Sequence, residues 1–266
     1  MVTWPEPGAG FRWIDERWGP MLRCTPLDAV ARHGFTSRQL GLRPNDAAAT
    51  TWAAAVASVG CDVAHLARVR QVHGAAVRVV RAGDLDAPVP DADAVITTVP
   101  GLAVAVVAAD CVPVLLADPR TGAVAAVHAG WRGTAANVVG AAVAAMTREF
   151  GVRPDTLVAA IGPSIGACCY EVGEELLTAF GAAGHSSVDL AEWFARDAAG
   201  RLRLDLWQAN TDLLVRAGVA RAQVHVSGLC TQTHVNVLES FRVEGANAGR
   251  MAAIIVAQGQ GLGTRD

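Results

Sequence analysis

Two apolar runs joined by a short turn constrain the fold of this chain more than any other stretch of its sequence. The runs cover residues 112–117 and 123–128, and Asp118-Pro119-Arg120-Thr121-Gly122 lies between them. A proline early and a glycine late in such a segment are typical of a turn between antiparallel strands. We therefore predict a hairpin in which Asp118 pairs with Ala123.

The polar residues of this hairpin gather at its open end, away from the turn. In the predicted register Cys111 falls opposite Gly130 and His128 falls opposite Pro113. Cys111 and His128 then share one face of the hairpin, with Cα atoms about 7–8 Å apart. A metal ion could span that distance, since zinc binds sulfur at about 2.3 Å and imidazole nitrogen at about 2.0 Å. The prediction depends on the register, because a slip of one residue would remove this arrangement.

A third candidate ligand, His73, lies in Gln71-Val72-His73-Gly74, just before another expected strand. Catalytic zinc is commonly held by three protein ligands, with one coordination position left open. His73, Cys111 and His128 could form such a set, although a single histidine is more often a structural residue. The sequence alone does not bring His73 to the hairpin, so both interpretations stay open.

The segment after His128 has the composition of an anion-binding loop. Gly130, Trp131 and Arg132 precede an expected helix. Glycine permits close approach of the backbone to a ligand, and the free N–H groups at a helix start favour an anion. Arg132 could donate two hydrogen bonds to a phosphate or carboxylate. The structural alternative is that Trp131 anchors the core and Thr134 caps the helix.

Composition places the chain among globular proteins. Apolar residues make up 52% and charged residues 18% of its 266 residues, and the formal net charge is −3. This balance argues against disorder and against a polyanion-binding surface, so we expect no nucleic-acid partner. The longest apolar stretch, 102–117, contains Asp110 and Pro113, so we expect no membrane span. No signal-peptide pattern is visible, and we expect a cytoplasmic protein whose six cysteines are thiols or ligands.

Apolar patterns predict eight strands and four helices. Runs rich in valine and isoleucine indicate strands at residues 75–80, 94–97, 102–107, 112–117, 123–128, 157–161, 224–227 and 251–256. Helical periodicity indicates helices at residues 47–59, 135–150, 173–180 and 206–217. Because strands occur in consecutive groups as well as between helices, we predict an α+β fold. We expect one domain over residues 1–266, with mixed β-sheets flanked by helices.

Five motifs occur in one order along the chain, namely Gln71–Gly74, Asp91–Ala94, Ala109–Pro113, Val127–Gly133 and Gly162–Glu171. Together they resemble the polyphenol oxidoreductase laccase-like family, also called the laccase-domain purine nucleoside phosphorylase family. The resemblance extends from about His33 to about Ile255 and implies a single α+β domain with a zinc ion held by His73, Cys111 and His128. It also implies phosphorolysis of adenosine, inosine and methylthioadenosine, together with adenosine deamination. Purine nucleosides and phosphate would then be the partners.

Other functions stay open beside this one. A copper polyphenol oxidase needs further histidines for a trinuclear oxygen site, and none of the seven histidines forms a His-x-His pair, so we expect zinc rather than copper. A Cys/His hydrolase or amidase acting on a cell-wall precursor would use Cys111 as nucleophile and His128 as base, which leaves His73 without a role. A non-catalytic zinc-binding protein would have a closed site, with Cys168 or Cys169 as fourth ligand.

Phosphorolysis requires donors for the phosphate anion and a proton for the departing purine. The candidate anion donors are Arg38, Arg132 and Arg242, each of which could instead form a structural ion pair. Asp110 or Glu171 could deliver the proton if burial raises its pKa. The candidate catalytic residues are Cys111, Asp110, Arg38 and Arg242.

Two segments depart from the family pattern. A shortened stretch, residues 39–46, replaces the glycine-rich loop that usually follows Arg38. Near the C-terminus the family pattern Phe-Phe-Ser-Tyr-Arg-Arg is replaced by Leu238-Glu239-Ser240-Phe241-Arg242-Val243, which lacks the tyrosine hydroxyl and the second arginine. We expect both changes to alter substrate range or phosphate affinity and to leave the metal ligands untouched.

Overall fold

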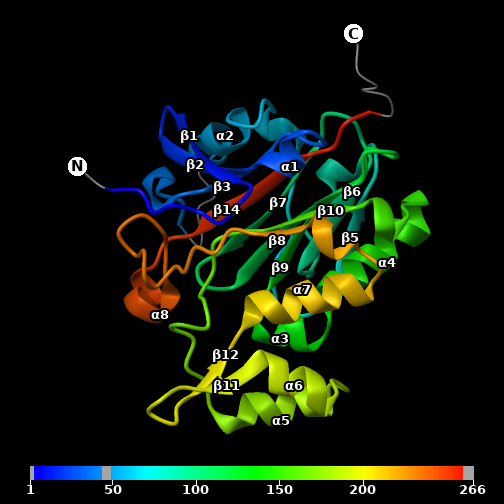
Figure 1. Cartoon of the computed structure of the whole chain (residues 1–266). Helices are drawn as coiled ribbons and strands as arrows, with labels where there is room; N and C mark the ends of the chain where they lie inside the picture. The colour runs from blue at the N-terminus through cyan, green and yellow to red at the C-terminus, as the bar shows by residue number, and fades with distance from the viewer. Residues whose placement is uncertain (1–2, 44–48, 260–266) are drawn as a thin grey trace.

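The strands of the chain form two six-stranded sheets and one small sheet of two strands (Figure 1). The computed structural model describes residues 3–43 and 49–259. The first sheet has the order β1 (Phe11–Glu16), β2 (Gly19–Cys24), β3 (His33–Thr36), β14 (Met251–Val256), β7 (Ala103–Ala108) and β4 (Leu66–Ala67). The second has the order β13 (Val224–Val226), β10 (Val158–Ile161), β8 (Val112–Ala117), β9 (Val124–Ala129), β6 (Ala94–Thr97) and β5 (Val77–Val80). The third pairs β11 (Phe194–Arg196) with β12 (Leu202–Leu204).

Eight α-helices lie within the described ranges. They are α1 (Thr25–Asp28), α2 (Ala49–Ala57), α3 (Trp131–Ala135), α4 (Val138–Phe150), α5 (Glu174–Ala182), α6 (Ser187–Trp193), α7 (Leu206–Arg216) and α8 (Phe241–Glu244). Short 3-10 turns occur at Arg38–Leu40, Val63–His65, Asp84–Asp86, Pro154–Thr156, Arg221–Gln223 and Gly245–Asn247. Among the described residues, no helix combines the length and the apolar composition that crossing a membrane requires.

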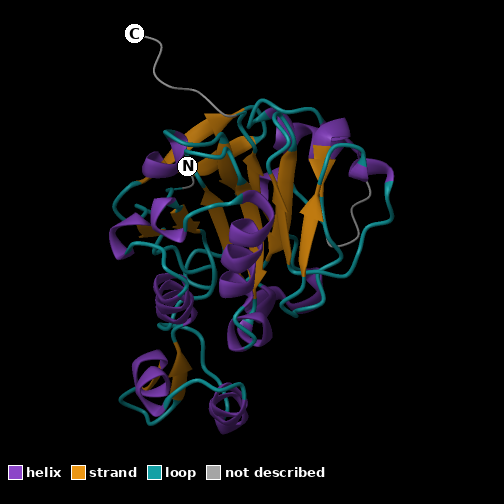
Figure 2. Cartoon of the chain, turned by 90° about the vertical axis from the view of Figure 1, so that its right-hand side faces the viewer, coloured by secondary structure: helices purple, strands orange, loops and turns teal. Residues whose placement is uncertain are grey.

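The two large sheets pack face to face, with helices on their outer faces (Figure 2). Side chains from both sheets form the core between them, and α2 covers the outer face of the first sheet. Helices α4 and α7 cover the outer face of the second sheet. Strand β8 is therefore buried on both faces, with Leu116 directed to the helices and Leu115 to the other sheet. Burial on both faces explains why its sequence is continuously apolar rather than alternating.

The structure confirms the predicted α+β fold with mixed sheets. Strands β4–β7, β5–β6 and β10–β13 pair in parallel and the remaining pairs are antiparallel. All eight predicted strands are present, and the hairpin has the predicted register, because Pro113 pairs with His128 in β8–β9. The Asp118 amide also donates to the Ala123 carbonyl oxygen at 2.9 Å. The open end of this hairpin is thus placed as the sequence suggested.

Some elements differ from the prediction. The helix expected at residues 135–150 is interrupted at Asn137, whose backbone has a φ of 56°, so that α3 ends before α4 begins. The helix expected at 47–59 is α2, and its first predicted residues, like part of the shortened stretch at 39–46, lie outside the described residues. Strands β1–β4, β11 and β12 were not predicted, because they are short or carry charged residues on a partly exposed face.

Candidate metal centre

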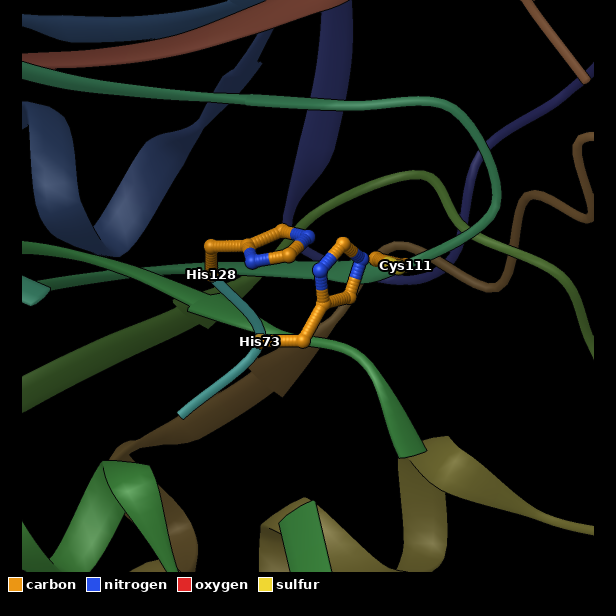
Figure 3. Close-up of side chains that lie close together, drawn as sticks. All are labelled: His73, Cys111 and His128. Atoms are coloured by element: carbon orange, nitrogen blue, oxygen red, sulfur yellow. The ribbon is translucent and has the colours of Figure 1, made fainter. Parts of the chain in front are cut away.

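The structure brings His73, Cys111 and His128 to one point at the open end of the β8–β9 hairpin (Figure 3). One ring nitrogen from each histidine and the Cys111 Sγ all lie within 4.8 Å of one another. The two imidazole rings meet edge to face, with centroids 4.9 Å apart. Cys111 directly precedes β8, His128 lies in β9, and His73 comes from the loop before β5. The predicted ligand set is therefore spatially complete.

A buried carboxylate, Asp93, holds the ring of His128 and the backbone of His73. Its Oδ1 lies 2.9 Å from Nδ1 of His128 and accepts the His73 backbone N–H at 2.9 Å. Its Oδ2 accepts the N–H groups of Gly74 at 2.6 Å and of Val72 at 3.2 Å. With Nδ1 of His128 donating to this carboxylate, Nε2 is the ring nitrogen available to a metal, as in many zinc sites.

Asp93 had no role in the sequence interpretation, although it lies in one of the five motifs. The sequence does carry one signal for it, because Asp93 is an acidic residue directly before the apolar strand β6. That strand pairs with β9, which carries His128. Asp93 is fully buried, and a buried acid needs partners. The pKa of this carboxyl would be raised by burial, but hydrogen bonds from His128 and from backbone N–H groups outweigh burial and lower it.

The backbone around the ligands is unusual in two places. His73 has a φ of 61° and Asp110 a φ of 84°, the left-handed region that costs most residues about 1–3 kcal/mol. A Cβ built on Gly130 would lie 2.9 Å from the Cys111 Sγ and 3.1 Å from Cδ2 of His73. Gly130 therefore leaves room for the ligands, and its predicted role in anion binding stays a prediction.

Ionisation at the site is set by the ligands themselves. Burial raises the pKa of the Cys111 thiol, but hydrogen bonds with His128 and His73 and the charges of the two rings outweigh it, and the pKa falls to about 6. Burial lowers the pKa of His128, but hydrogen bonds with Asp93 and Cys111 outweigh it and raise this pKa to about 9. Near neutral pH the site therefore holds a thiolate beside an imidazolium.

These observations test whether the residues fit a metal ion. One thiolate and two imidazoles are a donor set that suits zinc, and three ligands leave one position open. The lowered pKa of Cys111 matches the requirement that a thiol ligand be deprotonated, and the free space at Gly130 keeps the donors accessible to an ion. His73, Cys111 and His128 therefore fit a zinc ion.

The three ligands open into a cavity of about 690 Å³. Its other lining residues include the arginines Arg43, Arg68, Arg70, Arg242 and Arg250 and the aromatic side chains Trp52, Tyr170 and Phe241. An apolar pocket with a few convergent polar groups is the usual form of a small-molecule site. Flat aromatic surfaces and cationic groups in one cavity suit a ligand that carries both a ring system and an anion.

Asp110 and Arg242 meet at the wall of this cavity. Asp110 accepts the backbone N–H of Arg242 at 2.6 Å and the hydroxyl of Thr231. Arg242 donates from Nη1 to the Glu171 carbonyl oxygen at 3.1 Å, and its guanidinium carbon lies 5.2 Å from the centroid of the Tyr170 ring. The structure thus brings two of the candidate catalytic residues to the metal ligands.

Arg38 lies apart from the residues that line the cavity. Its Nη2 donates to Glu244 Oε1 at 2.7 Å and lies 3.5 Å from a carboxylate oxygen of Glu239, and its Nη1 donates to the Val235 carbonyl oxygen. This is the ion-pair arrangement that the sequence left open as the alternative. A role for Arg38 in binding phosphate stays a prediction.

Other predicted positions also lie outside the cavity lining. Arg132 stacks on Trp131, with its guanidinium carbon 4.1 Å from the ring centroid, and Trp131 packs against the core. The exposed Glu171 carboxylate faces Arg201 and Arg203, with N–O distances of 3.8 Å to each. Anion binding by Arg132 and Trp131 stays a prediction.

Cys168 and Cys169 are not grouped with the three ligands. Their sulfur atoms gather instead with that of Cys230. The closed four-ligand site considered from the sequence is therefore wrong for the described residues, and the His73–Cys111–His128 set remains open on one side.

Comparison with known proteins gives consistent results. Residues 24–258 match the family described as "Multi-copper polyphenol oxidoreductase laccase". A purine nucleoside phosphorylase of Streptomyces coelicolor is 39% identical over 249 residues, which cover 93% of this chain and 95% of that protein. Adenosine deaminase RL5, from an unknown prokaryotic organism, is 38% identical over 199 residues, 72% of this chain and 75% of that protein. The crystal structure of YfiH from Bacillus licheniformis has a TM-score of 0.84 and 27% identity, covering 94% of this chain and 100% of that chain.

Proposed function

Since this chain belongs to the multi-copper polyphenol oxidoreductase laccase family, we propose that it is a zinc-dependent purine nucleoside phosphorylase that also deaminates adenosine. The observation that carries the proposal is the opening of the His73–Cys111–His128 cluster into a cavity lined by arginine and aromatic side chains. Adenosine, inosine and methylthioadenosine, with phosphate, are the substrates we propose. The names of the relatives support both activities.

We assign the metal to His73, Cys111 and His128. Zinc held by these ligands would supply a Lewis acid at the edge of the cavity. Asp93 holds the His128 ring through Nδ1 and holds the loop that carries His73. Its role is therefore to keep the His128 imidazole directed at the Cys111 sulfur and to fix the backbone from which the His73 side chain extends.

Phosphorolysis transfers the ribosyl group from the purine to phosphate. A phosphate oxygen forms a bond to C1′, the bond from C1′ to the purine nitrogen breaks with its electron pair passing to that nitrogen, and the nitrogen takes up a proton. The guanidinium of Arg242 pairs with the phosphate anion in this proposal, and Tyr170 and Trp52 provide flat surfaces for the base. Pairing is needed because an unpaired anion in a partly apolar cavity is costly.

Asp110 receives a different role from the one expected. Both of its carboxylate oxygens already accept hydrogen bonds, from Thr231 and from the Arg242 backbone. We therefore propose that Asp110 positions Arg242 rather than protonating the purine. Hydrogen phosphate supplies that proton in our proposal, since it loses its own proton when one of its oxygens bonds to C1′.

A Cys/His hydrolase or amidase is the second candidate. A thiol whose pKa falls to about 6 beside a histidine is the pair that such enzymes use for nucleophilic attack. Two histidines converging on one sulfur, together with an orienting carboxylate, favour a ligand set over this pair. Copper oxidase chemistry has less support, because it requires a second copper site rich in histidine. Within residues 3–43 and 49–259 the second group of potential metal ligands is Cys168, Cys169 and Cys230, which contains no histidine.

The direct test is turnover of purified protein with inosine and adenosine, each with and without phosphate. We expect hypoxanthine and ribose 1-phosphate from inosine only when phosphate is present, and inosine from adenosine without phosphate. A chelator should stop both reactions, and added zinc should restore them. A covalent substrate adduct on Cys111, detected by mass spectrometry, would instead establish the hydrolase.

A further inference from the structure

A second cluster of thiols lies outside the chemistry described above. Cys168 and Cys169 are neighbours in the loop between β10 and α5, and Cys230 follows β13. The three Sγ atoms lie within 4.8 Å of one another, with 3.5 Å between those of Cys168 and Cys169. All three are free thiols in the structure.

The backbone holds these two segments together independently of the sulfurs. Ser164 and Cys230 form a β-bridge, and the Thr231 amide donates to the Ser164 carbonyl oxygen at 3.1 Å. The Gly166 amide donates to the Cys230 Sγ at 3.3 Å. Cys230 is therefore already a hydrogen-bond acceptor in a fixed position.

The spacing of the sulfurs suits a single ion. Three thiolates bound to one ion at about 2.3 Å place their sulfur atoms about 3.8–4.0 Å apart. The observed spacings, 3.5 Å between Cys168 and Cys169 and at most 4.8 Å for the other pairs, bracket that value. Cys230 is buried and Cys168 is exposed, so an ion has a path of entry from the surface.

Charged side chains lie next to the cluster. A surface depression beside Cys168 and Cys169 is lined by Arg201, Arg203 and Arg242, as well as by the carboxylate of Glu171. Asp197, which pairs with Arg201 and Arg203, is a second carboxylate here, so the three cations leave one positive charge that offsets part of the negative charge of three thiolates. A disulfide would explain only two of the three cysteines, because any pairing leaves the third thiol free, whereas a metal ion can bind all three.

We propose that Cys168, Cys169 and Cys230 form a second metal site, which binds a thiophilic ion with a filled d shell, Zn(II) or Cu(I), through three thiolates. Soft sulfur ligands select these ions over harder cations. The ion joins the loop that carries Tyr170 to the segment that carries Thr231. Because Thr231 donates to Asp110, and Asp110 holds the Arg242 amide, this ion stabilises the cavity wall without touching the substrate.

Metal titration of the full-length, reduced, chelator-treated protein tests the proposal. With Zn(II), and separately with Cu(I) under anaerobic conditions, we expect the wild type to retain two equivalents after desalting, measured by elemental analysis. The Cys168→Ser variant should retain one equivalent of metal. Because Cys168 is exposed, we expect this change not to disturb folding. Cys111→Ala should also retain one. Cys61→Ser, outside both clusters, is the matched control and should retain two.

Cobalt(II) identifies which sulfurs bind. Its sulfur-to-metal charge-transfer band scales with the number of bound thiolates, so Cys168→Ser should reduce the band to about a quarter and Cys111→Ala to about three quarters. One equivalent in the wild type, with a band unchanged by Cys168→Ser, would overturn the proposal. So would a disulfide within the cluster, seen by mass spectrometry, in a protein that binds no second ion after reduction. Neither result depends on nucleoside turnover.

Discussion

The two clusters of potential metal ligands adjoin two hollows that share Arg242, and they are built in different ways. In the His73–Cys111–His128 cluster a buried carboxylate orients the ligands, and the site opens into a cavity. In the Cys168–Cys169–Cys230 cluster the orientation comes from backbone hydrogen bonds, and arginines lie beside the sulfurs. The comparison teaches that three donors close together do not by themselves define a catalytic site. The orienting carboxylate and the adjoining cavity distinguish the first cluster.

The largest expected effect is that of Cys111→Ala. Removing the thiolate leaves two histidines, so the ion at the first cluster should be lost and both nucleoside reactions should fall to background. Cys168→Ser should leave more than about a tenth of the activity, because that cluster does not touch substrate in our proposal. Rates for the two variants, with metal content measured on the same samples, test the comparison. Equal loss of activity in both would contradict the division of roles.

The pH dependence of metal binding should also separate the clusters. In the metal-free first cluster Cys111 loses its proton near pH 6 and His128 near pH 9, so binding between these values releases one proton, from His128. Zinc affinity there should therefore rise about tenfold per pH unit from pH 6 to 9, about a thousandfold in all.

The second cluster should respond more steeply over the same range. Burial, assisted by the neighbouring thiols Cys169 and Cys230, raises the pKa of Cys168 to about 12, so more than one proton must leave when a metal binds. Competition titrations of Cys168→Ser and Cys111→Ala at several pH values would measure the two slopes separately. Identical slopes would contradict the assigned protonation states.

Asp93→Asn should have a smaller effect than loss of a ligand. The amide keeps the size of the carboxylate but weakens its hold on the His128 ring and on the loop at His73. Such changes next to a metal ligand typically cost about 10–100-fold in metal affinity or activity. Zinc affinity and the circular dichroism spectrum of this variant are the measurements. A wild-type affinity with intact folding would show that Asp93 does not orient the ligands.

Arg242→Ala should have the most selective effect. Losing one charge-assisted hydrogen bond to phosphate costs about 1.5–3 kcal/mol, or about 10–100-fold in kcat/KM for phosphate. Adenosine deamination needs no phosphate and should change less, with zinc content unchanged.

Arg38→Ala provides the matched comparison for Arg242→Ala. Its ion pair with Glu244 leads us to expect a lower Tm and a smaller effect on phosphate. An equal rise of the phosphate KM in both variants would restore the phosphate role that the sequence suggested for Arg38.

Much of the fold and most of the first cluster could be predicted from the sequence, because local signals specify them. The turn at Asp118–Gly122 fixes the register of β8–β9, and that register brings Cys111 close to His128. Asp93 was missed because its role depends on the pairing of β6 with β9, which no local pattern shows. The ion-pair partners of Arg38 could not be named from the sequence, because Glu239 and Glu244 lie some two hundred residues further along the chain.

The four hydrogen bonds accepted or shared by Asp93 have a kinetic consequence. They tie the backbone of the His73 loop and the His128 ring to the residue that precedes β6, so this loop and the His128 imidazole are positioned by folding and not by the arriving ion. Little conformational entropy is then left to lose when an ion enters. Exchange of one metal for another should accordingly proceed without any opening of the sheets, at a rate set by proton release from His128 and by departure of the bound ion. Amide hydrogen exchange in β6 and β9 should be nearly the same with and without metal.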